Sequence, residues 1–372
     1  MSSPLLTIAI PTYNRAGFLK NLLDGIVLQA EVLAGVVQIC ISNNASTDNT
    51  RVLVMGYMEK YPGLITYNEN RENLGLDKNL MKVMEMANGK FTWMMGDDDT
   101  VVAAGVGKVV DVIKNNNNEH TGLVIVGHQT YCADPASGKK TIYFSGIDGQ
   151  RPRVYAMDVK NIMGMRLDFC FLSVLIFNSF FLKKTLQEEK IVLQKAIGNH
   201  YIHTFLYQLM FLNHPELQVI KYNEKIVESD VHYYKFYIED MFELYYTARV
   251  ALSDLSLEKK SIHPDYKKAV LTQKNKFVAG FVRDMAAAKA FSQFNYISFF
   301  GCMAFFFKKT NLARAAFFSL YFVIISTLPP FLLKSAYKTF IKTKYAGSWQ
   351  NIWLAIVVRY GQMSQGSQRV IR

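Results

Sequence analysis

Strand-like and helix-like segments alternate at regular spacing through the first 130 residues of this 372-residue chain. Short apolar segments predict strands at 6–10, 36–42, 65–68, 91–95 and 122–126, and the helical spacing of apolar residues predicts helices at 17–29, 47–60, 77–87 and 104–114. This order is typical of βαβ units. We therefore expect an α/β fold with a Rossmann-like, mostly parallel sheet flanked by helices.

Length and composition limit the class of protein. At about 100–200 residues per domain, the chain is long enough for two or three domains. Half of the residues are hydrophobic and 19% are charged, which excludes a disordered chain. The four cysteines lack CxxC spacing, so neither a disulfide framework nor a zinc cluster is expected. The first residues lack the pattern of a secretory signal. The cysteine spacing and the missing signal pattern both favour the cytosol.

The positive charge is confined to the C-terminal third of the chain. Residues 1–250 hold 24 Lys and Arg against 26 Asp and Glu, whereas residues 251–372 hold 18 against 4. No carboxylate side chain follows Asp284, although eleven basic residues do. A region whose charged side chains are almost all positive predicts a polyanionic partner, either nucleic acid or an anionic membrane surface.

Apolar and aromatic residues between these charges favour the membrane and argue against nucleic acid. Residues 315–333 form a nearly continuous hydrophobic run, but the two prolines at 329–330 favour a re-entrant or interfacial segment over a spanning helix. Lysines at every fourth position then predict a basic amphipathic helix of the membrane-surface type: Lys334, Lys338 and Lys342. The alternative is a set of core helices in a soluble subdomain with a solvated lysine face.

Polar residues follow each of the first four predicted strands, at 11–15, 43–48, 70–79 and 96–99. The carboxyl ends of parallel strands meet at one edge of a sheet, and open α/β sheets bind their ligands there. Neither a GxGxxG fingerprint nor a GxxxxGK[ST] loop is present, which argues against dinucleotide oxidoreduction and P-loop hydrolysis of nucleoside triphosphates.

The run Asp97, Asp98 and Asp99 is the strongest chemical signal in the chain. Three adjacent carboxylates repel one another, and a divalent cation that prefers oxygen ligands relieves that repulsion. Magnesium takes one or two protein carboxylates and fills its remaining positions with phosphate oxygens and water. The triplet therefore predicts a Mn²⁺ or Mg²⁺ site that also binds a nucleotide diphosphate. An acidic, solvated helix cap is the structural alternative.

Together these motifs resemble the family 2 glycosyltransferases with the GT-A fold, and within them the O-antigen sugar transferases of the abequosyltransferase type. The resemblance rests on TIAIPTYNR at 7–15, SNNASTD at 42–48, NLG at 73–75 with Asn79, and GKFTWMMGDDD at 89–99. It is close over residues 5–130, thins towards residue 240 and is absent from the tail.

The resemblance implies a domain organisation. We expect a GT-A glycosyltransferase domain over 1–240, with a donor half at 1–130 and an acceptor half at 131–240. A helical connector would follow at 241–290, and basic, aromatic-rich, membrane-associated helices would form 291–372.

The resemblance also implies roles for individual residues. The donor-binding residues that it implies are Pro11, Thr12, Tyr13, Arg15, Asn43, Asn73, Gly75, Asp97 and Asp98. Asn43 stands where the family often has an acidic residue that reads the base, so the identity of the base stays open. The implied metal ligands are Asp97 and Asp99, with Asp99 as the principal one.

The general base is the point at which the chain departs from the family. Relatives carry a carboxylate at the start of a later helix, whereas the corresponding stretch at 197–203 contains none. His200 and His203 are candidates because an unperturbed imidazole suits a base at neutral pH, although His203 also fits a buried helix face. Asp168 is the remaining carboxylate candidate. His232 lies in a stretch resembling the loop over the donor site.

These expectations combine into a metal-dependent, inverting transfer of a sugar from a nucleotide-diphosphate sugar to a polyprenyl-diphosphate-linked glycan. The reaction would belong to bacterial O-antigen or capsule synthesis, at the cytoplasmic face of the inner membrane, with a peripheral or re-entrant tail holding the enzyme beside its acceptor. Two alternatives stay open: a non-catalytic sugar-nucleotide-binding or assembly subunit, and a nucleotidyltransferase, against which the missing glycine-rich loop counts.

Overall fold

The computed structural model describes residues 3–133, 140–145, 151–156, 171–198, 201–230, 327–329 and 332. The chain divides into two compact units, residues 1–232 with 261–266 and residues 233–260 with 267–372. The predicted connector at 241–290 lies outside the described residues, and so does the tail at 291–372 apart from 327–329 and 332. The domain boundaries therefore stay predictions.

The first part of the chain folds as the alternating pattern predicts. Its elements in order are β1 (Leu6–Thr12), α1 (Ala16–Val32), β2 (Val37–Asn43), α2 (Thr50–Lys60), β3 (Ile65–Glu69), α3 (Leu76–Met86) and β4 (Phe91–Met94). β1 pairs in parallel with β2 and with β4, and β2 pairs in parallel with β3. Both neighbours of β1 are therefore parallel strands, which is the arrangement that βαβ connections produce.

The second part of the described chain completes the sheet. Its elements are β5 (Asp99–Val101), α4 (Gly105–Asn116), β6 (Thr121–Ala133), β7 (Lys140–Ser145), β8 (Arg153–Ala156), the 3₁₀ turn η2 (Leu172–Val174), β9 (Leu175–Asn178), α6 (Ser179–Glu188), α7 (Lys190–Ala196), α8 (Ile202–Asn213) and β10 (Gln218–Asp230). The strand order is β3-β2-β1-β4-β9-β6-β10-β5, with β7 beside β6 and β8 beside β10.

The expectation of a mostly parallel sheet is wrong for this second part. β9 lies between β4 and β6 and runs antiparallel to both. β10 is parallel to β6 but antiparallel to β5 and β8, and β7 is antiparallel to β6. The apolar run before residue 178 indicates a strand, but a strand's direction depends on the connection that precedes it. The sheet is therefore mixed.

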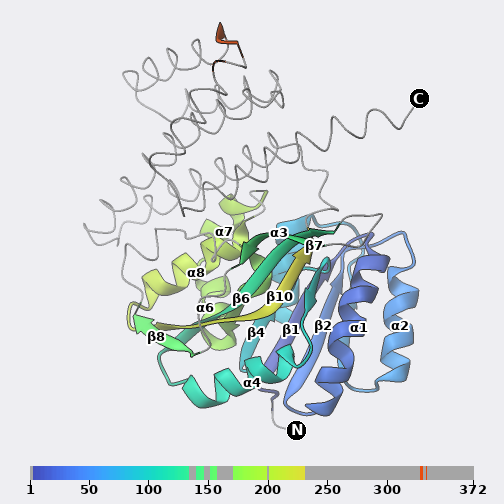
Figure 1. Ribbon diagram of the computed structural model, residues 1–372, viewed down its shortest axis with the longest axis horizontal. Coiled ribbons are helices and arrows are strands. Elements are labelled where there is room, and N and C mark those ends of the chain that lie inside the picture. The colour runs from blue at the N-terminus through green and yellow to red at the C-terminus, as the bar shows by residue number, and fades with distance from the viewer. Residues whose placement is uncertain are drawn as a thin grey trace. The chain divides into compact units, whose positions relative to one another are not determined.

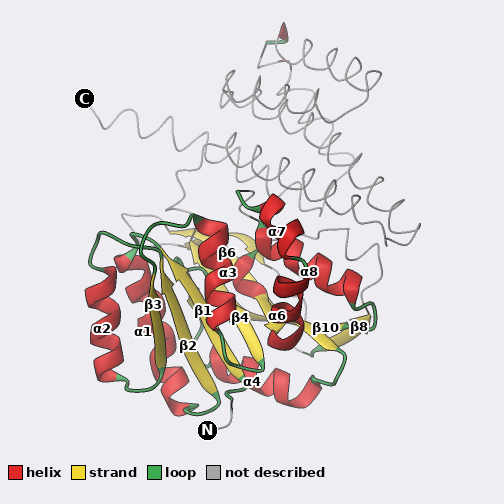
Figure 2. Ribbon diagram, turned by 180° about the vertical axis from the view of Figure 1, so that it is seen from behind, coloured by secondary structure: helices red, strands yellow, loops and turns green. Residues whose placement is uncertain are grey.

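Helices cover both faces of the sheet. α1, α2 and α4 lie over one face (Figure 1), and α3, α6 and α8 lie over the other (Figure 2). All seven residues of β1 are buried, as expected for a strand packed between two helical layers. Among the described residues, the largest fully buried side chain is that of Trp93, in the neighbouring strand β4. The core therefore lies under the strands whose carboxyl ends carry the predicted site.

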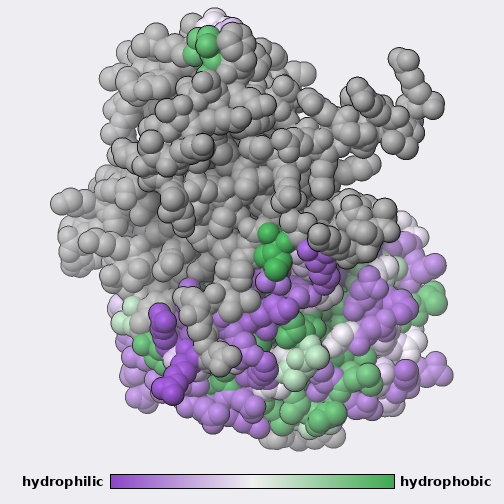
Figure 3. Space-filling model, in the orientation of Figure 1, coloured by the Kyte–Doolittle hydropathy of each residue, from purple (hydrophilic) through white to green (hydrophobic). Residues whose placement is uncertain are grey.

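The visible surface of the described residues alternates between hydrophilic and hydrophobic side chains (Figure 3). In the described ranges, no helix has both the length and the apolarity needed to cross a bilayer. The hydrophobic run at 315–333 falls almost entirely outside those ranges.

Candidate active site

The polar strand ends meet at the carboxyl edge of the sheet, as the sequence predicts. β4 ends at Met94, and the acidic triplet begins in the short link to β5, whose first residue is Asp99. The hydroxyl of Thr12, at the end of β1, donates a 2.7 Å hydrogen bond to Oδ2 of Asp97. Asn44, which directly follows β2, donates through its backbone N–H to the carbonyl of Thr12 at 2.9 Å. Three strand ends thus contact one another directly.

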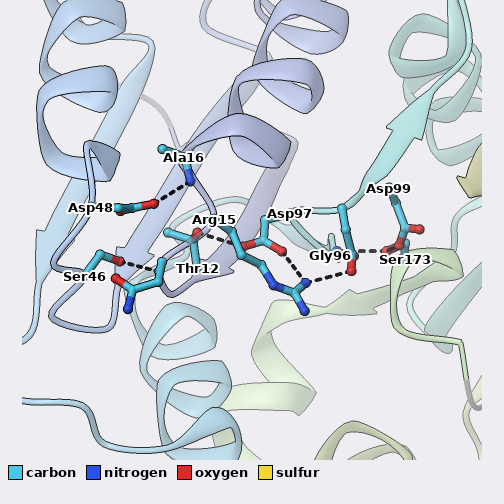
Figure 4. A network of polar contacts seen from close by, with 11 residues as sticks. Thr12, Arg15, Ala16, Ser46, Asp48, Gly96, Asp97, Asp99 and Ser173 are labelled. Atoms are coloured by element: carbon cyan, nitrogen blue, oxygen red, sulfur yellow. Dashed lines mark hydrogen bonds and ion pairs between the residues drawn. The ribbon is translucent and has the colours of Figure 1, made fainter. Parts of the chain in front are cut away.

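Arg15 is the counter-ion of the first two carboxylates (Figure 4). Its Nη1 atom lies 3.1 Å from Oδ1 of Asp97 and 2.7 Å from Oδ2 of Asp98. The Arg15 side chain is 43% exposed, whereas those of Asp97 and Asp98 are 6% and 14% exposed. A solvent-accessible guanidinium therefore lies over two largely buried carboxylates.

Burial is the main reason that the pKa values of Asp97 and Asp99 are raised. It raises the pKa of Asp97 to about 6, with the charge of Arg15 opposing the rise and that of Asp98 adding to it. Burial, together with repulsion from Asp98, also raises the pKa of Asp99 well above its usual range, and hydrogen bonding by Ser173 and Ser229 opposes this. A cation close to Asp99 would reverse the effect of both causes.

Asp99 has the features of a metal ligand. The Ser173 hydroxyl donates to its Oδ2 atom (Figure 4). In the part of the chain that the structure describes, the Oδ1 atom is buried and accepts no hydrogen bond. No group of three or more potential ligands from His, Cys, Asp and Glu is assembled among those residues. The triplet thus fits a Mg²⁺-like ion that takes one or two carboxylates and completes its shell with phosphate and water.

Two loops beside the triplet are locked together by hydrogen bonds. Asn14 and Ala45 both have positive φ, at 52° and 58°. The backbone N–H of Asn14 donates to the Ser46 hydroxyl at 2.9 Å, and Oδ1 of Asn14 accepts from the N–H of Thr47 at 2.7 Å. The loops after β1 and β2 therefore form one unit, and Tyr13, in the first of them, is exposed.

Asp48 joins the amino ends of two helices. Its Oδ2 atom accepts a 2.9 Å hydrogen bond from the N–H of Ala16, the first residue of α1 (Figure 4). Its Oδ1 atom accepts from both the N–H and the hydroxyl of Thr50, the first residue of α2. One carboxylate thus satisfies backbone donors that each helix start leaves free.

An asparagine network holds the next part of the predicted donor site. The Asn44 amide donates to Oδ1 of Asn73 at 2.7 Å and to the carbonyl of Gly75 at 3.3 Å. Its oxygen accepts from the N–H of Leu74 at 2.9 Å and from the Asn70 amide at 3.0 Å. Gly75, with a φ of 81°, allows the turn into α3. Asn73 and Gly75 are therefore part of a fixed turn.

Asn43, the candidate for reading the base, is fully buried. Its amide donates to the Tyr67 hydroxyl at 2.8 Å, and its Oδ1 atom accepts from the N–H of Ser46 at 3.0 Å. The amide nitrogen and the Oδ1 atom of Asn43 are thus both hydrogen-bonded within the protein. Its role towards a base stays a prediction, as does that of Pro11, which is buried at the end of β1.

Of the candidate bases, the structure describes only His203, which is buried in the first turn of α8. His200, Asp168 and His232 lie outside the described residues. The segment leading to α8 is held against α3, because Asp77, in the first turn of α3, accepts a 2.7 Å hydrogen bond from the N–H of Gly198. The predicted base segment thus contacts the helix that follows the asparagine network.

Two serines of the site were not predicted from the sequence. Ser173, in η2, contacts Asp99, and Ser229, in β10, lies directly opposite Asp99 in the β10–β5 pair. Neither serine is part of a local motif, and only the folded sheet brings them to the triplet.

A helix-covered α/β sheet with an acidic strand end at its carboxyl edge is the arrangement that the resemblance to the GT-A glycosyltransferases implies. Residues 7–171 match the model of the family described as glycosyl transferase family 2. The matched segment is just under half of the chain and is similar to that family.

Two curated relatives match over about a quarter of the chain. Abequosyltransferase RfbV of Salmonella typhimurium is 39% identical over 97 residues, which are 26% of this chain and 29% of that protein. An uncharacterized glycosyltransferase of Mycoplasma genitalium is 34% identical over 98 residues, which are 26% of this chain and 33% of that protein. The matched part of the chain thus spans only about a third of these relatives' length.

One solved structure resembles this fold over most of the length of both chains. Mannosyltransferase PcManGT from Pyrobaculum calidifontis, in complex with GDP-Man and Mn²⁺, matches with a TM-score of 0.51 and 13% identity. The match covers 97% of this chain and 88% of that one. At this identity the likeness concerns the fold.

Proposed function

We propose that this protein is a metal-dependent, inverting glycosyltransferase that moves a sugar from a nucleotide-diphosphate sugar to a lipid-linked glycan. One observation carries the proposal: a buried carboxylate, Asp99, has one oxygen held by Ser173 and a second that accepts no hydrogen bond in the described part of the chain. The family match over 7–171 and the abequosyltransferase relative support transfer of a sugar in O-antigen or capsule synthesis.

In this proposal Asp99 and Asp97 would hold Mn²⁺ or Mg²⁺, and the ion would supply positive charge that stabilises the diphosphate leaving group. The hydroxyl of Thr12 fixes the orientation of Asp97 through the hydrogen bond that it donates, and the charge of Arg15 faces the same carboxylate. The loops at 11–15 and 43–48 form the nucleoside side of the site. His200, His203 and Asp168 are the candidates for taking the proton of the acceptor hydroxyl.

The donor half of the proposal can be tested by calorimetric titration. Purified protein is titrated with UDP-, GDP-, CDP- and dTDP-sugars, with Mn²⁺ and with EDTA. We expect one donor to bind only with the metal, and Asp99→Asn to abolish that binding. Asp111→Asn, which removes an exposed carboxylate from α4, is the matched control and should bind like the wild type.

Turnover separates the two function classes that the sequence leaves open. Release of the nucleoside diphosphate in the presence of a polyprenyl-diphosphate glycan would support the transferase. Metal-dependent donor binding without such release would favour a non-catalytic sugar-nucleotide-binding subunit. If no donor binds in the presence of metal, the transferase proposal is wrong, and a non-catalytic assembly subunit becomes the favoured function.

The membrane half of the proposal rests on the one-signed charge of the tail, and it places the enzyme at the cytoplasmic face of the inner membrane. Basic residues near an anionic leaflet contribute on the order of 1 kcal/mol each. We therefore expect the full chain to float with vesicles that contain phosphatidylglycerol and to float less with phosphatidylcholine alone. Replacing Lys334, Lys338 and Lys342 together by Gln should weaken flotation, whereas replacing Lys78, Lys82 and Lys114 by Gln should leave it unchanged.

A further inference from the structure

Ser173 is bonded to the acidic strand end through both its side chain and its backbone. Its hydroxyl donates to Oδ2 of Asp99 and accepts a 2.8 Å hydrogen bond from the N–H of Gly96. Its carbonyl accepts a 2.8 Å hydrogen bond from the indole N–H of Trp93. Ser173 is fully buried, as is Trp93. The position of Ser173 relative to the end of β4 is thus fixed by three hydrogen bonds.

These contacts determine which group receives the hydroxyl proton of Ser173. A backbone N–H can only donate, so the bond from Gly96 uses the serine oxygen as an acceptor. The single hydroxyl proton is then free to bond to Asp99, and the structure places it there. Asp99 therefore has one oxygen fixed by a donor, while its Oδ1 atom accepts no hydrogen bond within the described ranges.

The packing around Gly96 independently indicates that this arrangement is tightly built. A Cβ atom at Gly96 would lie 2.9 Å from Oδ1 of Asp98, 3.0 Å from Oδ2 of Asp99 and 3.4 Å from the Ser173 oxygen. The first two of these distances are too short for a real side chain without a shift of the carboxylates. The three polar groups thus occupy the space that a side chain at position 96 would need.

We propose that Ser173 is a positioning residue that orients Asp99 towards a divalent cation. This inference rests on the proposed function, because it takes Asp99 as a metal ligand. Carboxylates that bind a metal are themselves held by hydrogen bonds, and loss of such an outer partner typically lowers metal affinity about 10- to 100-fold. Ser173 is the partner that fixes Oδ2 of Asp99 and leaves Oδ1 for the ion.

The test is Mn²⁺ binding by the full-length protein without any donor, measured as the loss of the free Mn²⁺ signal in electron paramagnetic resonance. We expect Ser173→Ala to weaken binding about 10- to 100-fold. Ser173→Thr, which keeps the hydroxyl, should bind within a few-fold of the wild type, and Ser173→Cys, with a weaker donor, should fall between Thr and Ala.

Ser179→Ala is the matched control. Ser179 is also buried and shares a 2.7 Å hydroxyl–hydroxyl hydrogen bond with Thr92 of β4, but it lies at the opposite end of that strand's pairing with β9. Its variant should lose stability yet bind Mn²⁺ like the wild type. Melting temperatures of all variants separate a loss of fold from a loss of orientation.

The outcomes distinguish this inference from the function on which it rests. If the wild type binds no Mn²⁺, or Asp99→Asn binds it equally well, the metal site itself is refuted. If Asp99→Asn loses binding while a folded Ser173→Ala retains it, the metal site stands and the role of Ser173 is refuted. Equal losses in the Thr, Cys and Ala variants at unchanged melting temperature would also refute a role for the hydroxyl.

Discussion

Nη1 of Arg15 lies 2.7 Å from Oδ2 of Asp98, so the chain provides its own cation for the acidic strand end. A divalent ion at the triplet would compete with this guanidinium for the same negative charge. The competition is limited in strength, because Arg15 is 43% exposed and solvent screens its charge.

Removal of Arg15 should therefore affect metal and donor in opposite directions. An exposed ion pair contributes at most about 1 kcal/mol, so we expect Arg15→Ala to tighten binding of Mn²⁺ alone by up to about 5-fold. The same variant should weaken binding of the nucleotide sugar, because Arg15 belongs to the predicted donor set. Arg15→Lys retains the charge and should show no tightening. Unchanged Mn²⁺ affinity in Arg15→Ala would mean that the ion does not bind beside Asp97 and Asp98.

Asp48 should make stability depend on pH. Burial raises the pKa of Asp48, but hydrogen bonds from Thr50 and from the backbone of Ala16 outweigh it, and the net pKa is lowered. A carboxyl whose pKa is lower in the folded state stabilises the protein above its unfolded pKa, and this contribution is lost as the pH falls through the folded pKa. Asp48→Asn should therefore be less stable than the wild type at pH 7.

The expected loss for Asp48→Asn is on the order of 1 kcal/mol, the usual value of a helix cap, and solvent exposure of Asp48 keeps it from being larger. Urea denaturation at pH 7 and at pH 3 measures the difference. The gap between the two proteins should narrow at pH 3. A gap of equal size at both pH values would show that the carboxylate charge is not what joins the two helices.

The Asn44 side chain should be among the least replaceable of the polar residues. Asn44→Ala leaves the N–H of Leu74 without the partner that the structure gives it, whereas the Asn70 amide keeps its bond to Asn79 and the Asn73 oxygen keeps its bond from Gly75. Leaving a buried polar group unpaired costs about 1–3 kcal/mol. We expect a loss of roughly 1–3 kcal/mol in the free energy of unfolding. Asn88→Ala, at an exposed position, should stay within about 0.5 kcal/mol of the wild type.

Two glycines offer a paired test of the packing. A Cβ atom at Gly127 in β6 would lie 2.3 Å from the carbonyl oxygen of Glu224 in β10, so Gly127→Ala should destabilise the fold by about 1–3 kcal/mol. A Cβ atom at Gly107 in α4 would meet nothing within 4 Å, and Gly107→Ala should stabilise by about 0.5–1 kcal/mol. Thermal unfolding of both variants gives the comparison, and destabilisation by Gly107→Ala would contradict the open environment of that helix face.

β1, β2 and β4 could be predicted because they are almost entirely buried and mostly apolar, whereas β3 is only partly buried and ends in polar residues. The predicted helix at 47–60 begins instead at Thr50. The preceding residues are held in a loop by hydrogen bonds to Asn14 and Ala16, which no local pattern indicates. The helical pattern of the sequence thus predicted that a helix is present, whereas tertiary contacts determine the residue at which it begins.

The candidate site also contains a part that could be predicted from the sequence and a part that could not. The triplet Asp97–Asp99 follows an apolar strand, so its place at the sheet edge could be predicted from the pattern alone. The antiparallel direction of β9 could not, because an apolar segment fits a strand of either direction. The contact of Ser173 with the triplet depends on that direction, because η2 lies beside Gly96 only when β9 runs antiparallel to β4.

The distance in sequence between Asp99 and Ser173 is 74 residues, which bears on how the protein is made. At about 5–20 residues per second, a ribosome adds that length in roughly 4–15 s. During this interval β1 to β4 can already pair, since they are contiguous in the chain, while Asp99 lacks the serine that fixes it. For those seconds the acidic strand end of the nascent chain is without the serine that bonds Asp99 in the folded protein.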